Sequence, residues 1–126
     1  MKAAMTRVLV IDDNEDFAEL IRHFLQADGF SVAIARDGRI GMEIQRHQPA
    51  EIIVTDIFMP RQDGVETIAE LRKEFPQAKI IAMTGRESLT DYDALHVADE
   101  LGAVRTFKKP FDIPDLVAAV RELAVS

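Results

Sequence analysis

The sequence contains no cysteine among its 126 residues, which excludes disulfides, zinc–thiolate sites and cysteine nucleophiles. It also has no apolar run near the ~20 residues that a membrane-spanning helix needs. The first apolar run, Val8 to Ile11, ends in two aspartates, so we expect neither a signal peptide nor membrane insertion. Glycine-rich phosphate loops of the G-x-G-x-x-G or G-x-x-x-x-G-K-[ST] type are absent too.

The charge is strongly acidic, with 22 aspartates and glutamates against 15 lysines and arginines and a net charge of −7. Such a domain is a poor candidate for direct nucleic-acid binding, because duplex phosphates would repel it. The length suits a single domain over residues 1–126, which can bury roughly two-thirds of its extended surface without a disulfide or structural metal.

Apolar runs and helical patterns alternate five times along the chain. Continuous apolar runs are typical of strands buried on both faces, and three occur, at residues 8–11, 52–54 and 80–83. Two weaker runs lie at 32–34, expected at a sheet edge, and at 104–107, the least regular of the five.

Helical spacing of apolar residues fills the intervals, at 17–25, 40–44, 65–75, 95–101 and 113–124. Asn14, Asp37 and Asp112 are suitable N-caps, and Gly29 and Gly102 are suitable C-terminal residues. This alternating order predicts an α/β fold with a parallel sheet and helices on both faces.

Polar residues follow the apolar runs directly. In open parallel sheets, ligands bind beyond the carboxyl ends of the strands, so these residues are the candidates for function. Asp12 and Asp13 follow the first run, Asp56 the third, Thr84 the fourth and Lys109 the fifth. We expect three carboxylates, a hydroxyl and a lysine to converge on one edge.

Clustered carboxylates repel one another unless a cation neutralises them. Mg²⁺ accepts carboxylates together with phosphate oxygens and water, and lysine can balance charge on a phosphoryl oxygen. This inventory suits phosphoryl transfer to a carboxylate. Each motif alone is more often a helix cap, a turn or exposed basic surface. Their occurrence in order at successive strand ends is what favours a function.

Four segments together resemble the receiver domain of two-component response regulators, over essentially the whole chain. They are the acidic pair after the first strand, the run 56–64 with its Met-Pro-x-x-Asp-Gly ending, Thr84, and Lys109-Pro110-Phe111. The resemblance implies a doubly wound, flavodoxin-like (βα)₅ sandwich whose five parallel strands have the order 2-1-3-4-5.

The resemblance also implies a role for each matching residue. Asp56 would be the phosphoacceptor, Thr84 would move toward the phosphoryl group and Lys109 would bind it. Mg²⁺ would be held by Asp13 and Asp56 directly, by Asp12 mainly through water, and by the backbone carbonyl of Phe58. The Lys109–Pro110 peptide bond would be cis.

Two features depart from the family pattern. Thr106 occupies the position of the usual aromatic switch, and Phe107, one residue later, should point to the opposite face of the strand and pack in the core. The segment between Thr84 and Lys109 is also longer than usual, and we expect the extra length in the polar stretch from Arg86 to Asp93.

The leading hypothesis is a cytoplasmic signalling switch that takes a phosphoryl group from a histidine kinase or phosphotransfer protein and passes the signal to a downstream protein. It would catalyse only its own phosphorylation and dephosphorylation. One alternative is a receiver-fold interaction module with phosphate-independent output. Another is a small Mg²⁺-dependent hydrolase or nucleotide-binding flavodoxin-like protein. The sequence leaves open whether this is a stand-alone domain or a piece of a longer regulator.

Overall fold

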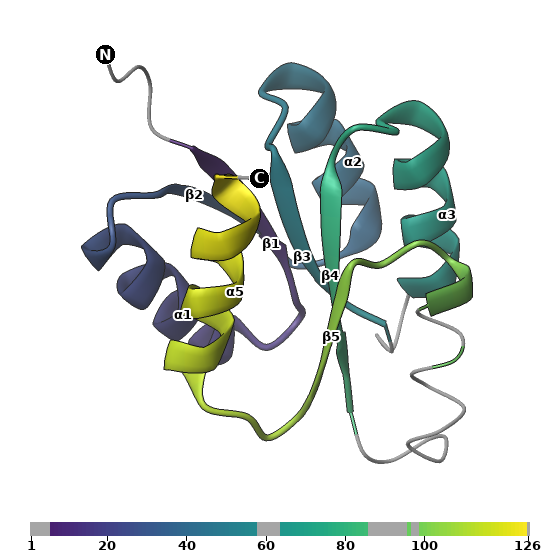
Figure 1. The fold of residues 1–126 in the computed structure, drawn as a ribbon. Coiled ribbons are helices and arrows are strands. Elements are labelled where there is room, and N and C mark those ends of the chain that lie inside the picture. The colour runs from purple at the N-terminus through teal and green to yellow at the C-terminus, as the bar shows by residue number, and fades with distance from the viewer. Residues whose placement is uncertain (1–5, 58–63, 86–95, 97–98, 126) are drawn as a thin grey trace.

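The sheet has five parallel strands in the expected order 2-1-3-4-5, numbered along the chain (Figure 1). The computed structural model describes residues 6–57, 64–85, 96 and 99–125. Within them the strands are β1 (Arg7–Ile11), β2 (Ser31–Ala35), β3 (Ile52–Asp56), β4 (Lys79–Thr84) and β5 (Arg105–Lys108). The two weaker apolar runs became the edge strands β2 and β5, because an edge strand needs less apolar surface than a central one.

Helices follow the strands as the apolar spacing predicted. They are α1 (Glu15–Ala27), α2 (Gly38–His47), α3 (Gly64–Glu74) and α5 (Ile113–Ala124). In the expected fourth helix, His96 and residues 99–100 are helical and Gly102 follows with a φ of 94°, whereas Leu95 and Ala98 lie outside the described residues. In the part of the chain that the structure describes, no helix has the length and hydropathy to cross a membrane.

The sheet separates two apolar cores, because successive side chains of a strand point to opposite faces. Val8 and Val10 of β1 pack on the same side as α1 and α5. Leu9 and Ile11 of the same strand pack on the other side with residues of α2 and α3. Figure 1 shows these two helix pairs on opposite faces of the sheet.

Two of the three predicted N-caps make their hydrogen bonds. The Asn14 side chain accepts from the backbone N–H of Phe17 at 3.1 Å, and Asp37 accepts from that of Ile40 at 2.9 Å. Asp112 occupies the N-cap position of α5 but makes no side-chain capping bond, so that prediction was right in position only. These caps fix where α1 and α2 leave the carboxyl edge of the sheet.

Gly41 of α2 provides a test of the tight packing between this helix and β1. A Cβ atom at this position would lie 2.5 Å from Cδ1 of the fully buried Ile11. We expect Gly41→Ala to destabilise the protein by about 1 kcal/mol in chemical denaturation, because overpacking outweighs the gain in helix propensity. Ile11→Val removes the clashing methyl, so Gly41→Ala should cost much less in that background. An equal cost in both backgrounds would contradict this packing argument.

Candidate functional site

The predicted residues meet at the carboxyl edge of the sheet. Asp12 directly follows β1, Asp56 ends β3, Thr84 ends β4 and Lys109 directly follows β5. The parallel register places these strand ends side by side, with Asp56 paired to Met83 and Thr84 paired to Lys108. One edge therefore collects side chains that are up to 97 positions apart in the sequence.

Three carboxylates form a cluster at this edge. Ligand oxygens of Asp12, Asp13 and Asp56 all lie within 4.8 Å of one another. Asp12 is fully buried and Asp56 is 5% exposed, whereas Asp13 is exposed. Buried carboxylates this close together need a compensating positive charge.

Lys109 provides that charge within the protein. Its Nζ donates to Asp12 Oδ2 at 2.8 Å and to Asp56 Oδ2 at 3.0 Å. Burial opposes the charge on the amine, but the hydrogen bond that Lys109 donates to Asp12 and the charge of Asp56 outweigh it and raise the pKa of Lys109 above its ordinary value. The lysine therefore stays protonated at neutral pH and holds both aspartates together.

Backbone hydrogen bonds fix the positions of these side chains. Asp12 Oδ1 accepts from the Asn14 N–H at 2.9 Å, and the Asp12 N–H donates to the carbonyl of Ala35 at 3.0 Å. The Lys109 N–H donates to the Thr84 carbonyl at 2.8 Å, and the Lys109–Pro110 bond is cis, as expected. Asp12 is thus held through both its side chain and its backbone, and the backbone of Lys109 is attached to the end of β4.

Position 106 is a threonine in place of the usual aromatic residue, and the neighbouring Phe107 packs against the core. Thr106 is half-buried in β5, where it pairs with Ala82. Phe107 packs against the core on the side of α1 and α5, as the alternation of side chains predicted. Thr84 is 2% exposed, so its side chain lies inside the edge and not on the surface.

An aromatic neighbour of Lys109 was missed in the sequence, where Phe17 was assigned only to the apolar stripe of its helix. Nζ of Lys109 lies 4.8 Å from the centroid of the Phe17 ring. The only signal for this contact was the position of Phe17 in the first turn after the acidic pair. That signal was too weak, because an apolar residue there is explained equally well by core packing.

Some predicted features lie outside the described residues. Phe58, whose carbonyl was expected to ligate the metal, belongs to the segment 58–63. The polar stretch from Arg86 to Asp93, expected to contain the extra loop length, lies in the segment 86–95. Asp12, Asp13, Asp56, Thr84 and Lys109 all fall within the described ranges.

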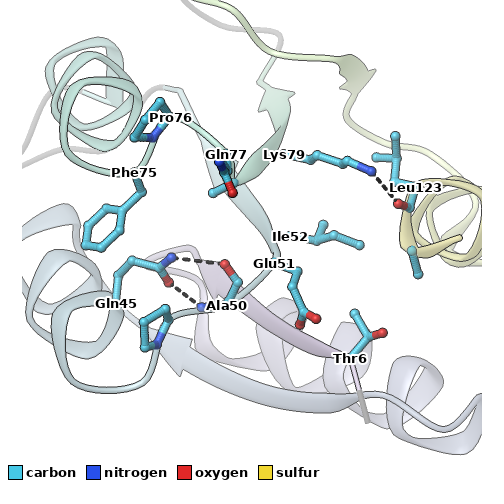
Figure 2. A pocket seen from close by; sticks show the side chains of 13 residues that line it. Thr6, Gln45, Ala50, Glu51, Ile52, Phe75, Pro76, Gln77, Lys79 and Leu123 are labelled. Atoms are coloured by element: carbon cyan, nitrogen blue, oxygen red, sulfur yellow. Dashed lines mark hydrogen bonds between the residues drawn. The ribbon is translucent and has the colours of Figure 1, made fainter. Parts of the chain in front are cut away.

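A pocket lies at the opposite end of the sheet from the carboxylate cluster (Figure 2). Its volume is about 630 Å³, and its lining includes Phe75, Ile52 and Leu123. Figure 2 shows two hydrogen bonds between the Gln45 side chain and the backbone of Ala50, which satisfy the amide of Gln45. We do not take it as the functional site, because none of the clustered carboxylates lines it.

Comparison with known proteins identifies the family of the chain. Residues 8–121 match the family described as response regulator receiver domain. The match covers most of the chain, and the chain belongs to this family of two-component response regulators.

Two curated relatives illustrate the similarity. The chain is 33% identical over 117 residues to the response regulator MprA of Mycolicibacterium vanbaalenii, covering 93% of this chain and 49% of that protein. It is 30% identical over 119 residues to the transcriptional regulatory protein CpxR of Escherichia coli K12, covering 94% and 49%. The chain therefore spans about half the length of these relatives.

Solved structures have the same fold. A response regulator receiver domain protein from Clostridium thermocellum superposes with a TM-score of 0.84 at 28% identity, covering 94% of each chain. A CheY-like receiver domain protein from Methanospirillum hungatei gives a TM-score of 0.87 at 25% identity, covering 97% of this chain and 96% of the other.

The donor set of the cluster fits Mg²⁺, which receiver domains generally use at an acidic pocket. Mg²⁺ prefers hard oxygen ligands, usually one or two carboxylates with the remaining positions given to water or phosphate. Asp13 adds an exposed carboxylate beside two buried ones, so the cluster has oxygen donors that face solvent.

Removing the ammonium should reveal how much it stabilises the fold. Without metal, we expect Lys109→Met to destabilise the protein by about 2 kcal/mol, because Asp12 and Asp56 lose their shared counter-charge. The value is below that for a fully buried pair, because 24% of the lysine side chain is exposed. Urea denaturation measures it, with Lys108→Met at the exposed neighbouring position as the control. Equal effects of both substitutions would contradict this role of Lys109.

Proposed function

We propose that this domain is a phosphorylation-dependent switch that accepts a phosphoryl group on Asp56 from a histidine kinase or phosphotransfer protein. The observation that carries the proposal is the position of Asp56. Its carboxylate lies at the edge of the sheet, within 4.8 Å of two other carboxylates and 3.0 Å from the ammonium of Lys109. A nucleophile beside a cation and a metal-binding acid cluster is the arrangement that phosphoryl transfer requires.

The transfer is a substitution at phosphorus. A carboxylate oxygen of Asp56 forms a bond to the phosphorus of a phosphohistidine, and the phosphorus–nitrogen bond breaks with its electron pair leaving on the imidazole. Dephosphorylation reverses the state of Asp56: a water oxygen attacks phosphorus, the bond to Asp56 breaks, and inorganic phosphate leaves. The domain catalyses only these two steps on itself.

Mg²⁺ would be held by Asp13 and Asp56, by Asp12 mainly through water, and by the carbonyl of Phe58. When bound, it supplies positive charge to phosphoryl oxygens and neutralises the acid cluster. Lys109 adds a second cation and stays close to Asp56 through its backbone bond to Thr84.

Phosphorylation shifts a conformational equilibrium only through interactions that differ between the two states. Thr84 and Lys109 would provide that difference by turning toward the new phosphoryl oxygens. Thr106 is too small to fill the space that an aromatic ring fills in most relatives, so coupling would rest on these two residues and on the segment from Arg86 to Asp93.

Residues 1–126 would form one receiver domain, located in the cytoplasm, that binds a kinase or phosphotransfer protein and then a downstream protein, without contacting nucleic acid itself. A second candidate is an interaction module whose output does not depend on phosphate. Thr106 favours it, because a half-buried threonine occupies the position of the usual aromatic switch. Phosphorylation of Asp56 with an unchanged conformation would favour that second candidate.

Acetyl phosphate tests the acceptor directly. With Mg²⁺, we expect it to add one phosphoryl group to the protein, seen as a single mass shift in intact-mass spectrometry. Asp56→Asn should abolish the shift because the amide is a poor nucleophile, whereas Asp115→Asn on the exposed face of α5 should leave it unchanged. A persistent mass shift in Asp56→Asn would place the acceptor elsewhere.

Asp13→Ala tests the metal site. We expect Mg²⁺ affinity, measured by calorimetry, to fall by at least roughly tenfold, because a direct ligand and its charge are lost. Without metal, the same substitution should raise the free energy of unfolding by up to about 1 kcal/mol, because it relieves repulsion in the cluster. Asp115→Ala should change Mg²⁺ affinity little. Parent-like affinity in Asp13→Ala would show that the metal binds elsewhere.

A further inference from the structure

The ammonium of Lys109 has a third neighbour besides its two carboxylates. Nζ lies over the ring of Phe17, 4.8 Å from the ring centroid, which is within the range of a cation–π interaction. Two of the three N–H donors of the ammonium go to Asp12 and Asp56. The ring therefore contacts the same group that balances the acid cluster.

The position of Phe17 is tied to that cluster through one residue. Asn14 donates its backbone N–H to Asp12 Oδ1 at 2.9 Å, and its side chain accepts from the Phe17 N–H at 3.1 Å. The capping turn of α1 thus places the acid and the ring on the same short segment. Lys109, which directly follows β5, contacts both the Asp12 carboxylate and the Phe17 ring.

Phe17 is also held from the other side by aromatic packing. Its ring meets that of Phe111 edge-on, with centroids 5.6 Å apart and planes at 78°. Phe111 in turn packs against Phe107 of β5 with centroids 5.1 Å apart. Edge-to-face contacts of this kind restrain ring orientation as well as adding apolar contact. The ring beside the ammonium is therefore held in place and not a loose surface side chain.

We propose that Phe17 is a positioning residue for Lys109: its ring keeps the ammonium over Asp56 while the lysine changes oxygen partners during phosphorylation. This inference rests on the proposed function, because it assigns the ring a part in that reaction. A carboxylate partner is lost or altered when Asp56 becomes an acyl phosphate, but the ring is unchanged by the chemistry. Its attraction is also less directional than a hydrogen bond, so the ammonium can turn from carboxylate to phosphoryl oxygen without leaving it.

The contact itself can be tested without phosphorylation or metal. In the parent protein, the ring current of Phe17 should shift the Lys109 ε-methylene protons upfield in ¹H–¹³C NMR spectra. Phe17→Leu should remove that shift, Phe17→Tyr should keep it, and Phe24→Leu, at an exposed aromatic position of the same helix, should leave it unchanged. A Lys109 signal that is unaffected by Phe17→Leu would overturn the proposal.

The role in the reaction needs a double-mutant cycle with Lys109→Met, which keeps the aliphatic stem and removes the charge. With acetyl phosphate and Mg²⁺, we expect Phe17→Leu to slow phosphorylation of Asp56 by roughly two- to fivefold, the factor that corresponds to one partly exposed cation–π contact. Phe17→Tyr should restore the parent rate. In the Lys109→Met background, Phe17→Leu should have no further effect, because there is no ammonium left to position.

The outcomes separate this proposal from the function on which it rests. Equal slowing by Phe17→Leu with and without the ammonium would show that the ring only supports the fold, and would overturn the positioning role. A parent-like rate in Phe17→Leu would overturn it as well. Failure of the parent protein itself to be phosphorylated would refute the proposed function, whereas the NMR comparison would still decide whether the ring holds the lysine.

Discussion

The pairing of one ammonium with two buried carboxylates is the interaction on which this edge of the molecule depends. Asp12 is fully buried and Asp56 nearly so, and both accept hydrogen bonds from Lys109. Without that cation, the strands β1 and β3 would end in uncompensated charge. The same pairing places the carboxylate of Asp56 3.0 Å from an ammonium at the carboxyl edge of the sheet.

Most of the fold followed from the sequence because burial on two faces leaves a clear pattern. The three central strands were continuous apolar runs, and the strand order came from the resemblance to receiver domains. The five charged and polar site residues were predicted from their places at strand ends. The contact of Phe17 with Lys109 was not, because it joins two residues far apart whose apolar and cationic natures suit many other positions. Asp112 shows a similar limit: a cap residue in the right place need not make the bond.

The aromatic rings near β5 lie on the face of the strand that α1 and α5 cover. Thr106 leaves one face of the strand without a ring, while Phe107 and Phe111 bring two rings to the face covered by α1 and α5. Those rings continue to Phe17, next to the lysine of the site. Packed rings therefore connect the last strand with the lysine beside Asp56 on the α1 side of the sheet.

The spacing of the site along the chain has a consequence for synthesis. Asp12 and Lys109 are 97 positions apart, and Asp56 lies 53 positions before the lysine. All three aspartates leave the ribosome long before the cation that balances them. Until Lys109 has been made, the growing chain lacks the ammonium that Asp12 and Asp56 share in the folded domain, which disfavours early closure of this edge. This edge can therefore close around its shared ammonium only once nearly the whole domain has been made, because the lysine is residue 109 of 126.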